Sequence, residues 1–254
     1  MPNSKNPKTK LPPGYQLRSF ESLESTSLKA KGLAQEGASS GLWVLADKQT
    51  AGKGRQGRTW SSLEGNLFAS LLLHPACDIS RIPELSFLSA VAVAGTLRHF
   101  SENNITCKWP NDVMIEGKKA AGILLESESS ANPGLPWVVI GLGINIVARP
   151  KEVDYPAACL NDFSSEPISR DAVFEILAEK MAEALSRWGE DGFGPIRTLW
   201  LNQAHNLGGK IKIESAGKFQ EGTFEGLSNS GALLLKNFQG NLVEVISGTV
   251  IKET

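Results

Sequence analysis

The stretch Gln49–Trp60 reads Gln-Thr-Ala-Gly-Lys-Gly-Arg-Gln-Gly-Arg-Thr-Trp and lies between two predicted strands. Its glycines at 52, 54 and 57 allow the backbone to fold closely around a ligand. Clustering Lys53, Arg55 and Arg58 is costly unless an anion neutralises them, so the loop suits a phosphate or a carboxylate. It is neither a Walker loop nor a dinucleotide fingerprint, because the required spacing and the strand–helix context are absent. A solvated basic turn is the alternative.

The elements predicted around this loop are strands and helices of ordinary length. Strands are expected at residues 42–46, 67–73, 105–109, 113–116, 121–125 and 138–146. Helices are expected at residues 25–37, 83–99, 173–188 and 195–203, with Ser25 or Thr26 as the first N-cap and Pro83 opening the second. Residues 127–136 predict a surface loop. After His205, glycines punctuate short β-like runs at 211–214, 233–236 and 242–246, which is typical of a small antiparallel barrel.

The predicted fold class is therefore α+β, with a mixed β-sheet backed by helices and a small β-barrel after it. We expect a disordered lead-in at residues 1–13, one large domain at 14–204 and the barrel at 205–254.

Composition limits the functions that the chain can have. Its 254 residues carry a net charge of -1 and are 41% hydrophobic, which allows a sizeable core and argues against non-specific nucleic-acid binding. No apolar run approaches the roughly 18–20 residues of a membrane span, and the N-terminus lacks the apolar core of a signal peptide. The cysteines at 77, 107 and 159 form no metal or redox motif, and the three histidines are equally scattered. We expect a cytoplasmic protein with reduced thiols.

Three further segments carry polar residues at strand ends. In Lys108–Asp112, Asn111 and Asp112 follow a proline that stops a strand, where they could serve a ligand or simply cap the turn. In 118–124, Lys119 enters an apolar strand, and an inward-facing lysine there needs an anionic partner; an exposed lysine is the alternative. In 141–145, Gly-Leu-Gly-Ile-Asn, the amide of Asn145 could bond a base edge or its own backbone.

Together, the order and content of these segments resemble the biotin protein ligase family. That family has a Ser-Thr-Asn segment at its first helix, a Q-T-x-G-x-G-R-x-G-R-x-W loop, then K-W-P-N-D, K-x-x-G-I-L and G-x-G-I-N, and a small C-terminal barrel. The resemblance covers about residues 15–252, and the glycine–arginine loop followed by K-W-P-N-D is highly specific. The chain departs at Ser27, where asparagine is usual, and at Lys53, where arginine is common.

The resemblance implies a catalytic domain at residues 14–204 of the biotin/lipoate ligase type and an SH3-like barrel after it. It also implies a reaction in two steps, with biotin and ATP as substrates and Mg²⁺ as the metal. The biotin carboxylate attacks the α-phosphate of ATP and pyrophosphate leaves. A lysine amine of a biotin carboxyl carrier protein domain, part of a biotin-dependent carboxylase, then attacks the biotinyl-adenylate and AMP leaves.

The resemblance also implies roles for particular residues. The catalytic set is Arg55, Arg58 and Lys119, whose charges would offset those of carboxylate and phosphates. The biotin-binding set is Ser25, Thr26, Ser27, Gln49, Lys53, Gly54, Arg55, Lys119 and Gly122. The ATP-binding set is Arg58, Trp60, Asn111, Asp112 and Asn145, with Asn145 at the adenine edge and Trp60 packing on the adenylate. Mg²⁺ would be carried by the phosphates, and whether Asp112 serves metal, amine or backbone stays open.

The alternatives are a lipoate or octanoate ligase or transferase of the same fold, a biotin-sensing DNA-binding repressor, and a binding protein that acts through its barrel. The Gly–Arg loop with Trp60 favours the biotin branch. About 20 residues precede the first helix, too few for a winged helix-turn-helix, so we expect no specific DNA binding. The barrel has no dense basic or aromatic face for a nucleic acid.

Overall fold

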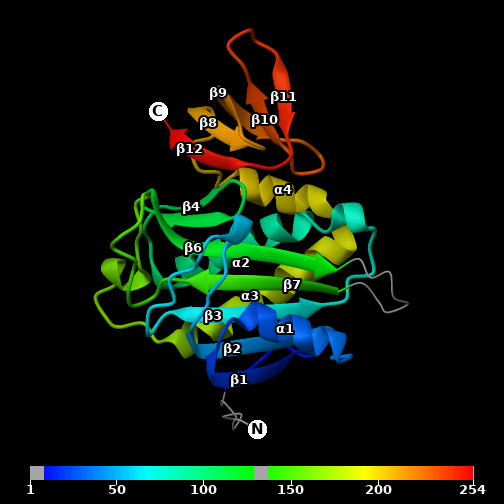
Figure 1. Ribbon diagram of the computed structural model, residues 1–254, viewed down its shortest axis with the longest axis vertical. Helices are drawn as coiled ribbons and strands as arrows, with labels where there is room; N and C mark the ends of the chain where they lie inside the picture. Colours follow the sequence, from blue (N-terminus) through cyan, green and yellow to red (C-terminus); the bar gives the residue numbers. More distant parts are fainter. Residues whose placement is uncertain (1–8, 129–136, 254) are drawn as a thin grey trace.

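The computed structural model describes residues 9–128 and 137–253, and a mixed seven-stranded sheet forms its centre (Figure 1). The strands are β1 (Gln16–Leu23), β2 (Leu42–Gln49), β3 (Leu67–Leu73), β4 (Ile105–Lys108), β5 (Asp112–Ile115), β6 (Lys118–Glu128) and β7 (Trp137–Ile144). They lie in the order β1-β2-β3-β7-β6-β5-β4. The β1–β2 pair is parallel and the other pairs are antiparallel. The predicted mixed sheet is confirmed, and β1 is a strand that the sequence analysis missed.

Helices cover both faces of this sheet (Figure 1). They are α1 (Thr26–Gln35), α2 (Glu84–Phe100), α3 (Arg170–Asp191) and α4 (Phe193–Leu201), with short 3-10 turns η1 (Arg55–Gly57), η2 (Ile79–Arg81) and η3 (Leu160–Phe163). Because side chains alternate along a strand, Leu42 and Val44 of β2 pack with α1. Trp43 and Leu45 pack in the core that α2 and α3 share. Ser25 caps α1 as predicted, since its hydroxyl accepts from the N–H of Leu28 at 3.5 Å.

The C-terminal part, where a small antiparallel barrel is predicted, is a five-stranded antiparallel sheet. Its strands are β8 (Lys210–Ser215), β9 (Lys218–Leu227), β10 (Leu233–Lys236), β11 (Leu242–Val245) and β12 (Thr249–Glu253), in the order β11-β10-β9-β8-β12. The sequence analysis placed three of these strands and missed β9 and β12.

The small sheet packs on α2 and α4 through aromatic side chains. The ring of Trp200 lies 5.5 Å from that of Phe87 and 6.4 Å from that of Phe224. The guanidinium of Arg197 donates to the carbonyl of Leu227 at 2.9 Å. One apolar core thus includes residues of both sheets. The division near residue 204 stays a prediction as a domain boundary.

Two of the predicted irregular segments fall partly outside the described residues. These are the first eight residues of the lead-in and most of the surface loop at 127–136. Within the described part of the lead-in, Leu11 packs against the main core and the N–H of Lys10 donates to Glu175 at 3.2 Å. The folded part of the chain therefore begins earlier than residue 14.

The structure also shows the state of the cysteines and the character of the helices. Cys77, Cys107 and Cys159 are all free thiols, and complete burial raises the pKa of the Cys107 thiol to about 12. Among the described helices, none combines the length and the apolar character needed to cross a membrane.

Replacing Trp200 by alanine should lower the free energy of unfolding by about 3–5 kcal/mol, because the side chain is fully buried where the two sheets meet. The neighbouring Leu199 is 36% exposed, and Leu199→Ala is the control, with an expected loss of about 1 kcal/mol or less. Urea unfolding followed by tryptophan fluorescence and by far-UV circular dichroism measures both. Similar losses for the two variants would contradict the proposed importance of this junction.

Candidate active site

A cavity of about 470 Å³ opens on the face of the large sheet that α1 covers in part. All the predicted site residues except Asn145 line it: Ser25, Thr26, Ser27, Gln49, Lys53, Gly54, Arg55, Arg58, Trp60, Asn111, Asp112, Lys119 and Gly122. These residues are up to 97 positions apart in the sequence, counting from Ser25 to Gly122. The volume falls in the usual range of roughly 300–1,000 Å³ for small-molecule sites.

One end of the cavity is a chain of hydroxyl groups and an amide at the start of α1. The hydroxyl of Ser70 donates to that of Thr26 at 2.8 Å, and Thr26 donates to Oε1 of Gln49 at 3.1 Å. Since the single proton of Ser70 is used in this way, Ser27, whose hydroxyl is 3.2 Å from that of Ser70, must donate to it. All the protons therefore point toward Gln49, and lone pairs of Ser27 remain available.

The amide nitrogen of Gln49 extends this chain to the glycine–arginine loop. Nε2 of Gln49 donates to the hydroxyl of Ser62 at 3.1 Å, and Ser62 donates to the carbonyl of Trp60 at 3.3 Å. A Cβ at Gly52 would lie 2.7 Å from that same carbonyl and 2.5 Å from the hydroxyl of Ser62, so only glycine fits. The hydroxyl end and the loop are thus fixed against one another.

The glycine–arginine loop forms a narrow turn over the cavity. Lys53 and Thr59 pair as an isolated antiparallel bridge, and the N–H of Gly54 donates to the carbonyl of Arg58 at 2.8 Å. At the tip, Gln56 has a positive φ of 55°, a conformation that few non-glycine residues adopt. The loop therefore has a defined shape that places its three cations around one opening.

The two arginines of the loop contact different parts of the chain. The guanidinium of Arg55 donates to Oδ1 of Asn111 at 3.2 Å, and that of Arg58 donates to the hydroxyl of Thr249, in β12, at 3.1 Å. Burial lowers the pKa of Arg55, while the Asp112 carboxylate acts in the opposite direction. Arg55 remains a cation at any physiological pH, so its half-buried charge suits an anion.

Trp60 lies on a part of the sheet that has no side chains. Gly122 of β6 and Gly143 of β7 are directly paired across the two strands. A Cβ at Gly143 would be 2.4 Å from Cε2 of Trp60, and one at Gly122 would be 2.8 Å from Cζ3. The indole Nε1 is buried without a hydrogen-bond partner. Unpaired buried donors are uncommon in folded proteins, and this one lies against the glycine floor, 2.7 Å from where a Cβ on Gly143 would stand.

Lys119 faces into the cavity and has the anionic partner that an inward lysine requires. Its Nζ is 2.7 Å from a carboxylate oxygen of Asp112. The same Nζ lies 5.7 Å from the ring centre of Trp60 and 5.2 Å from that of Tyr155. The side chains of Lys119 and Asp112 are only 19% and 21% exposed. The interpretation of Lys119 as a surface lysine is therefore wrong.

The turn that carries Asn111 is bonded both to a neighbouring strand and to the glycine–arginine loop. The side-chain nitrogen of Asn111 donates to the carbonyl of Ile123 at 2.7 Å, and its backbone carbonyl accepts from the N–H of Ile123 at 2.9 Å. Its Oδ1 accepts from Arg55. The Trp109–Pro110 bond before it is cis. Asn111 thus joins β6 to the glycine–arginine loop at the cavity wall.

Asn145 is the one predicted site residue that the structure does not bring to the cavity. Its side chain is 2% exposed. Nδ2 donates to the carbonyl of Ala158 at 3.1 Å, and Oδ1 accepts from Nδ2 of Asn66 at 3.4 Å. Both ends of the amide are used inside the protein, so the expected contact with an adenine edge is not supported, and the alternative of bonding to the backbone applies.

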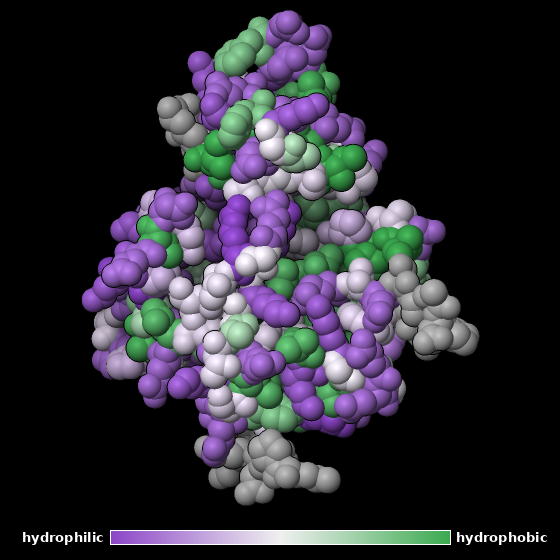
Figure 2. Space-filling view, viewed as in Figure 1, coloured by the Kyte–Doolittle hydropathy of each residue, from purple (hydrophilic) through white to green (hydrophobic). Residues whose placement is uncertain are grey.

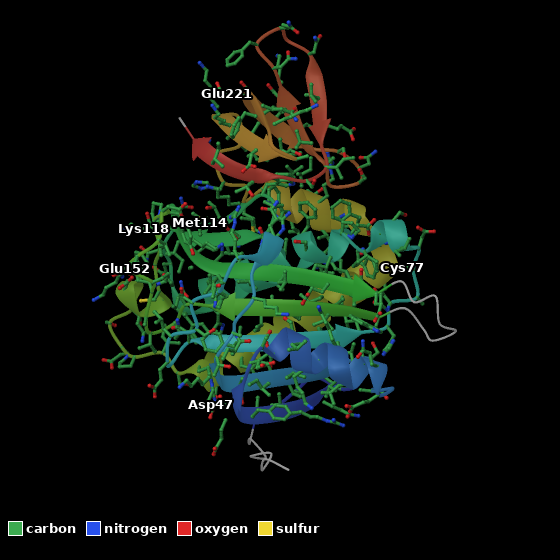
Figure 3. The ribbon with its side chains drawn as sticks, in the orientation of Figure 1. Asp47, Cys77, Met114, Lys118, Glu152 and Glu221 are labelled. Carbon is green, nitrogen blue, oxygen red and sulfur yellow. The ribbon has the colours of Figure 1, made fainter. Side chains whose placement is uncertain are left out.

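Several residues that line or support the cavity were missed from the sequence. Ser70 lies in a continuously buried strand, Thr249 lies in the C-terminal sheet, and Tyr155 lies on the segment after β7 together with Glu152, which Figure 3 labels. Burial raises the pKa of Tyr155, and the carboxylates of Asp112 and Asp154 raise it further. A signal did exist for Ser70, since it is the only hydroxyl in an otherwise apolar run at 67–73.

The described residues contain no group of three or more His, Cys, Asp or Glu side chains that could hold a metal ion. Across the face shown in Figure 2, hydrophilic and hydrophobic residues are interspersed. The groups that line the cavity are cations, amides and hydroxyls around a floor of glycines. This set suits an anionic small molecule with a polar head.

Comparisons with known proteins agree with this geometry. Residues 19–145 match the Biotin/lipoate A/B protein ligase family. The chain is 37% identical over 227 residues to the biotin–[acetyl-CoA-carboxylase] ligase of Paracoccus denitrificans, which covers 87% of this chain and 94% of that one. It is 34% identical over 234 residues to the bifunctional ligase/repressor BirA of Bacillus subtilis, which covers 89% and 71%.

The fold agrees as well. The biotin protein ligase of Aquifex aeolicus, solved in complex with biotin and ATP, superposes with a TM-score of 0.82 at 27% identity, covering 94% of this chain and 99% of that one. With the matched region spanning the hydroxyl network, the cationic loop and the Lys119–Asp112 pair, the chain belongs to the biotin/lipoate A/B protein ligase family.

Proposed function

We propose that the protein is a biotin–protein ligase, which uses ATP to activate biotin as biotinyl-AMP and then attaches it to a lysine of a biotin carboxyl carrier protein. The observation that carries this proposal is the arrangement of the cavity, in which a hydrogen-bonding end at Ser25–Ser27 and Gln49 adjoins a wall of cations. Biotin has a matching pair of ends, a polar ureido ring and a carboxylate, and the relative at 37% identity is a biotin–[acetyl-CoA-carboxylase] ligase.

The hydroxyl network supports the orientation of biotin. We place the ureido ring at the hydroxyl end, where Ser27 offers an acceptor and the backbone and side chain of Thr26 are fixed by Gln49. Such preorganised groups cost no rearrangement when the ligand binds. The apolar body of biotin would lie along Gly122 and Trp60, and its carboxylate would then point toward Lys119.

The cations support adenylation. Attack of a carboxylate on the α-phosphate of ATP brings two anions together, and fixed cations in a water-poor site offset that repulsion and the charge that develops in transfer. We assign this work to Lys119, Arg55 and Arg58. Lys119 is paired with Asp112 in the structure, so the incoming anions would compete with that carboxylate for its charge.

The nucleotide and the metal belong, in this proposal, to the end of the cavity near Asp112. Trp60 and Tyr155 offer aromatic surface to the adenylate, and Asp112 and Asp154 are the two carboxylates that act on Tyr155. Oxygen ligands are those Mg²⁺ prefers, and Mg²⁺ usually binds through one or two carboxylates plus substrate phosphates. Bound there, Mg²⁺ would neutralise phosphate charge, and the residues present fit such shared coordination.

The second substrate is a protein. A carrier domain must bring a lysine amine to the activated carbonyl, so it must approach the mouth of the cavity, where Thr249 and Val250 of the C-terminal sheet form part of the rim. We propose that this sheet contributes to the carrier-facing surface and supports Arg58 through Thr249. Lipoate or octanoate ligation is the alternative activity within the same family.

Pyrophosphate exchange into ATP should depend on both biotin and Mg²⁺, because adenylation is reversible and releases pyrophosphate. The measurement is incorporation of labelled pyrophosphate with biotin, lipoate or octanoate as the acid, each at matched concentration. Exchange supported by lipoate or octanoate but not by biotin would overturn the assignment and place the chain in the lipoate branch.

Lys119→Ala should reduce kcat/KM for adenylation by roughly 30- to 1000-fold, since a charge-assisted contact in a dry site is worth about 2–4 kcal/mol. Lys118 provides a matched control, because it precedes Lys119 in β6 and is exposed (labelled in Figure 3). Lys118→Ala should stay within about threefold of wild type. Losses of similar size in the two variants, or activity of Lys119→Ala within about threefold of wild type, would refute the role of Lys119.

Arg55→Gly should let biotinyl-adenylate form but escape about tenfold faster or more, because it removes one ionic anchor of a loop that we propose acts as a lid. Gln56→Gly is the control, since Gln56 already has a positive φ and the change adds flexibility without removing a cation, although it also removes a 3.3 Å bond from Arg58. The measurements are the release rate of labelled adenylate and the biotinylation of bystander lysines. Equal release from the two variants would count against the lid.

A further inference from the structure

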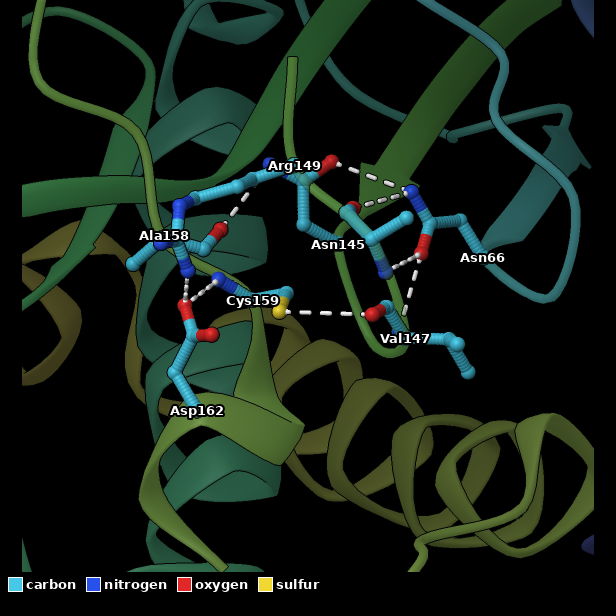
Figure 4. Close-up of polar contacts among 8 residues, drawn as sticks. Asn66, Asn145, Val147, Arg149, Ala158, Cys159 and Asp162 are labelled. Carbon is cyan, nitrogen blue, oxygen red and sulfur yellow. Dashed lines mark hydrogen bonds and ion pairs between the residues drawn. The ribbon is translucent and has the colours of Figure 1, made fainter. Parts of the chain in front are cut away.

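Asn66 is a buried polar residue that lies outside the cavity and that the mechanism above does not use. It is 1% exposed and immediately precedes β3. Because Leu67 pairs with Ile144 across β3 and β7, Asn66 is placed beside the point where the chain leaves β7. Figure 4 shows its side chain among the residues that follow that strand.

The carboxamide of Asn66 holds this exit by five hydrogen bonds. Its Oδ1 accepts from three successive backbone N–H groups, those of Ile146, Val147 and Ala148, at 2.9, 3.0 and 3.1 Å. Its Nδ2 donates to the carbonyl of Ala148 at 2.7 Å and to Oδ1 of Asn145 at 3.4 Å. One buried oxygen thus satisfies three donors that would otherwise be left unpaired at considerable cost.

The segment that begins there forms one wall of the cavity. Glu152, Val153, Asp154 and Tyr155 all line it. The far end of the segment pairs directly with the backbone of Lys119, whose N–H donates to Pro156 at 2.8 Å and whose carbonyl accepts from Ala158 at 2.9 Å. Asn145 adds a bond to the carbonyl of Ala158. The segment is therefore held at its start by Asn66 and at its end by Lys119.

We propose that Asn66 is a positioning residue for the nucleotide half of the site, an inference that rests on the proposed function. It sets the path of residues 148–156 and, through them, the place of Tyr155, while the end of the segment is held separately by the Lys119 backbone. The hydroxyl end of the cavity is anchored separately, because Thr26 and Ser27 bond to Gln49 and Ser70. Loss of Asn66 should therefore weaken use of ATP and leave biotin binding nearly unchanged.

The test compares Asn66→Ala and Asn66→Asp with wild type. Alanine removes all five bonds, and the KM for ATP in biotin-dependent pyrophosphate exchange should rise about tenfold or more. Aspartate keeps an acceptor for the three N–H groups and loses the two donors, so its KM should rise by less, about threefold. The Kd for biotin without ATP, measured by calorimetry, should stay within about twofold of wild type for both.

Asn237→Ala is the matched control. The Asn237 side chain accepts from the N–H groups of Gln239 and Asn241, each at 3.0 Å, in the turn between β10 and β11 of the small sheet. It removes side-chain-to-backbone bonds of the same kind outside the cavity-lining set. The KM for ATP should not change in this variant, and a rise comparable to that of Asn66→Ala would overturn the proposal.

Amide hydrogen exchange provides a readout that does not depend on turnover. In Asn66→Ala without ligands, exchange across residues 146–157 should accelerate, while residues 26–35 of α1 should exchange as in wild type. Unchanged exchange in 146–157, or equal losses in biotin and ATP affinity, would overturn the proposal. If Asn66→Ala does not fold, Asn66→Asp decides by the same criteria. If the wild type shows no biotin-dependent exchange of pyrophosphate, the proposed function fails, and the amide data still decide whether Asn66 anchors the segment.

Discussion

The cavity exists because Gly122 and Gly143 are paired directly opposite one another in the centre of the sheet. A Cβ on either position would enter the ring of Trp60, so a larger residue at 122 or 143 would force this ring to move into the cavity. Gly141 extends the same constraint toward α1, where a Cβ would lie 2.5 Å from the hydroxyl of Ser27. The glycines at 122, 141 and 143 thus leave one part of this face open for Trp60 and a ligand, and the opposite face is packed with apolar residues from the same strands.

Charge is arranged around this floor in pairs that an anionic ligand can displace. Lys119 is held by Asp112, and Arg55 by the neutral amide of Asn111. When a ligand anion replaces a weak or partly exposed partner of a cation, little interaction free energy is lost. The cation is also already oriented toward the cavity. The hydroxyl end has no such competition, because its protons run in one direction to Gln49. Binding of a polar ring and capture of an anion therefore depend on separate networks that meet at Trp60.

The sequence allowed most of the fold and nearly all of the site to be predicted, for a definite reason. In motifs such as the glycine–arginine loop, residues that are adjacent in the sequence act together. They therefore remain together at the cavity in the folded chain. Elements with weak local signals were missed. The parallel edge strand β1 contains only scattered apolar residues, β9 is interrupted by glycines and glutamates, and β12 is only five residues long. Their pairing depends on partners in other elements, which periodicity alone does not reveal.

The role of Asn145 could not be predicted from its neighbours in the sequence. An asparagine at the end of a buried strand has the same sequence signature whether its amide meets a ligand or the chain itself. The deciding partner is Asn66, 79 positions away, and the contact forms only because β3 and β7 are neighbours in the sheet. Asn66 bonds the start of the segment that carries Tyr155, and Asn145 bonds Ala158 near its end. Asn145, which was predicted to contact a ligand, thus supports the segment that forms one wall of the cavity. Its amide contributes to the site indirectly, through hydrogen bonds within the protein.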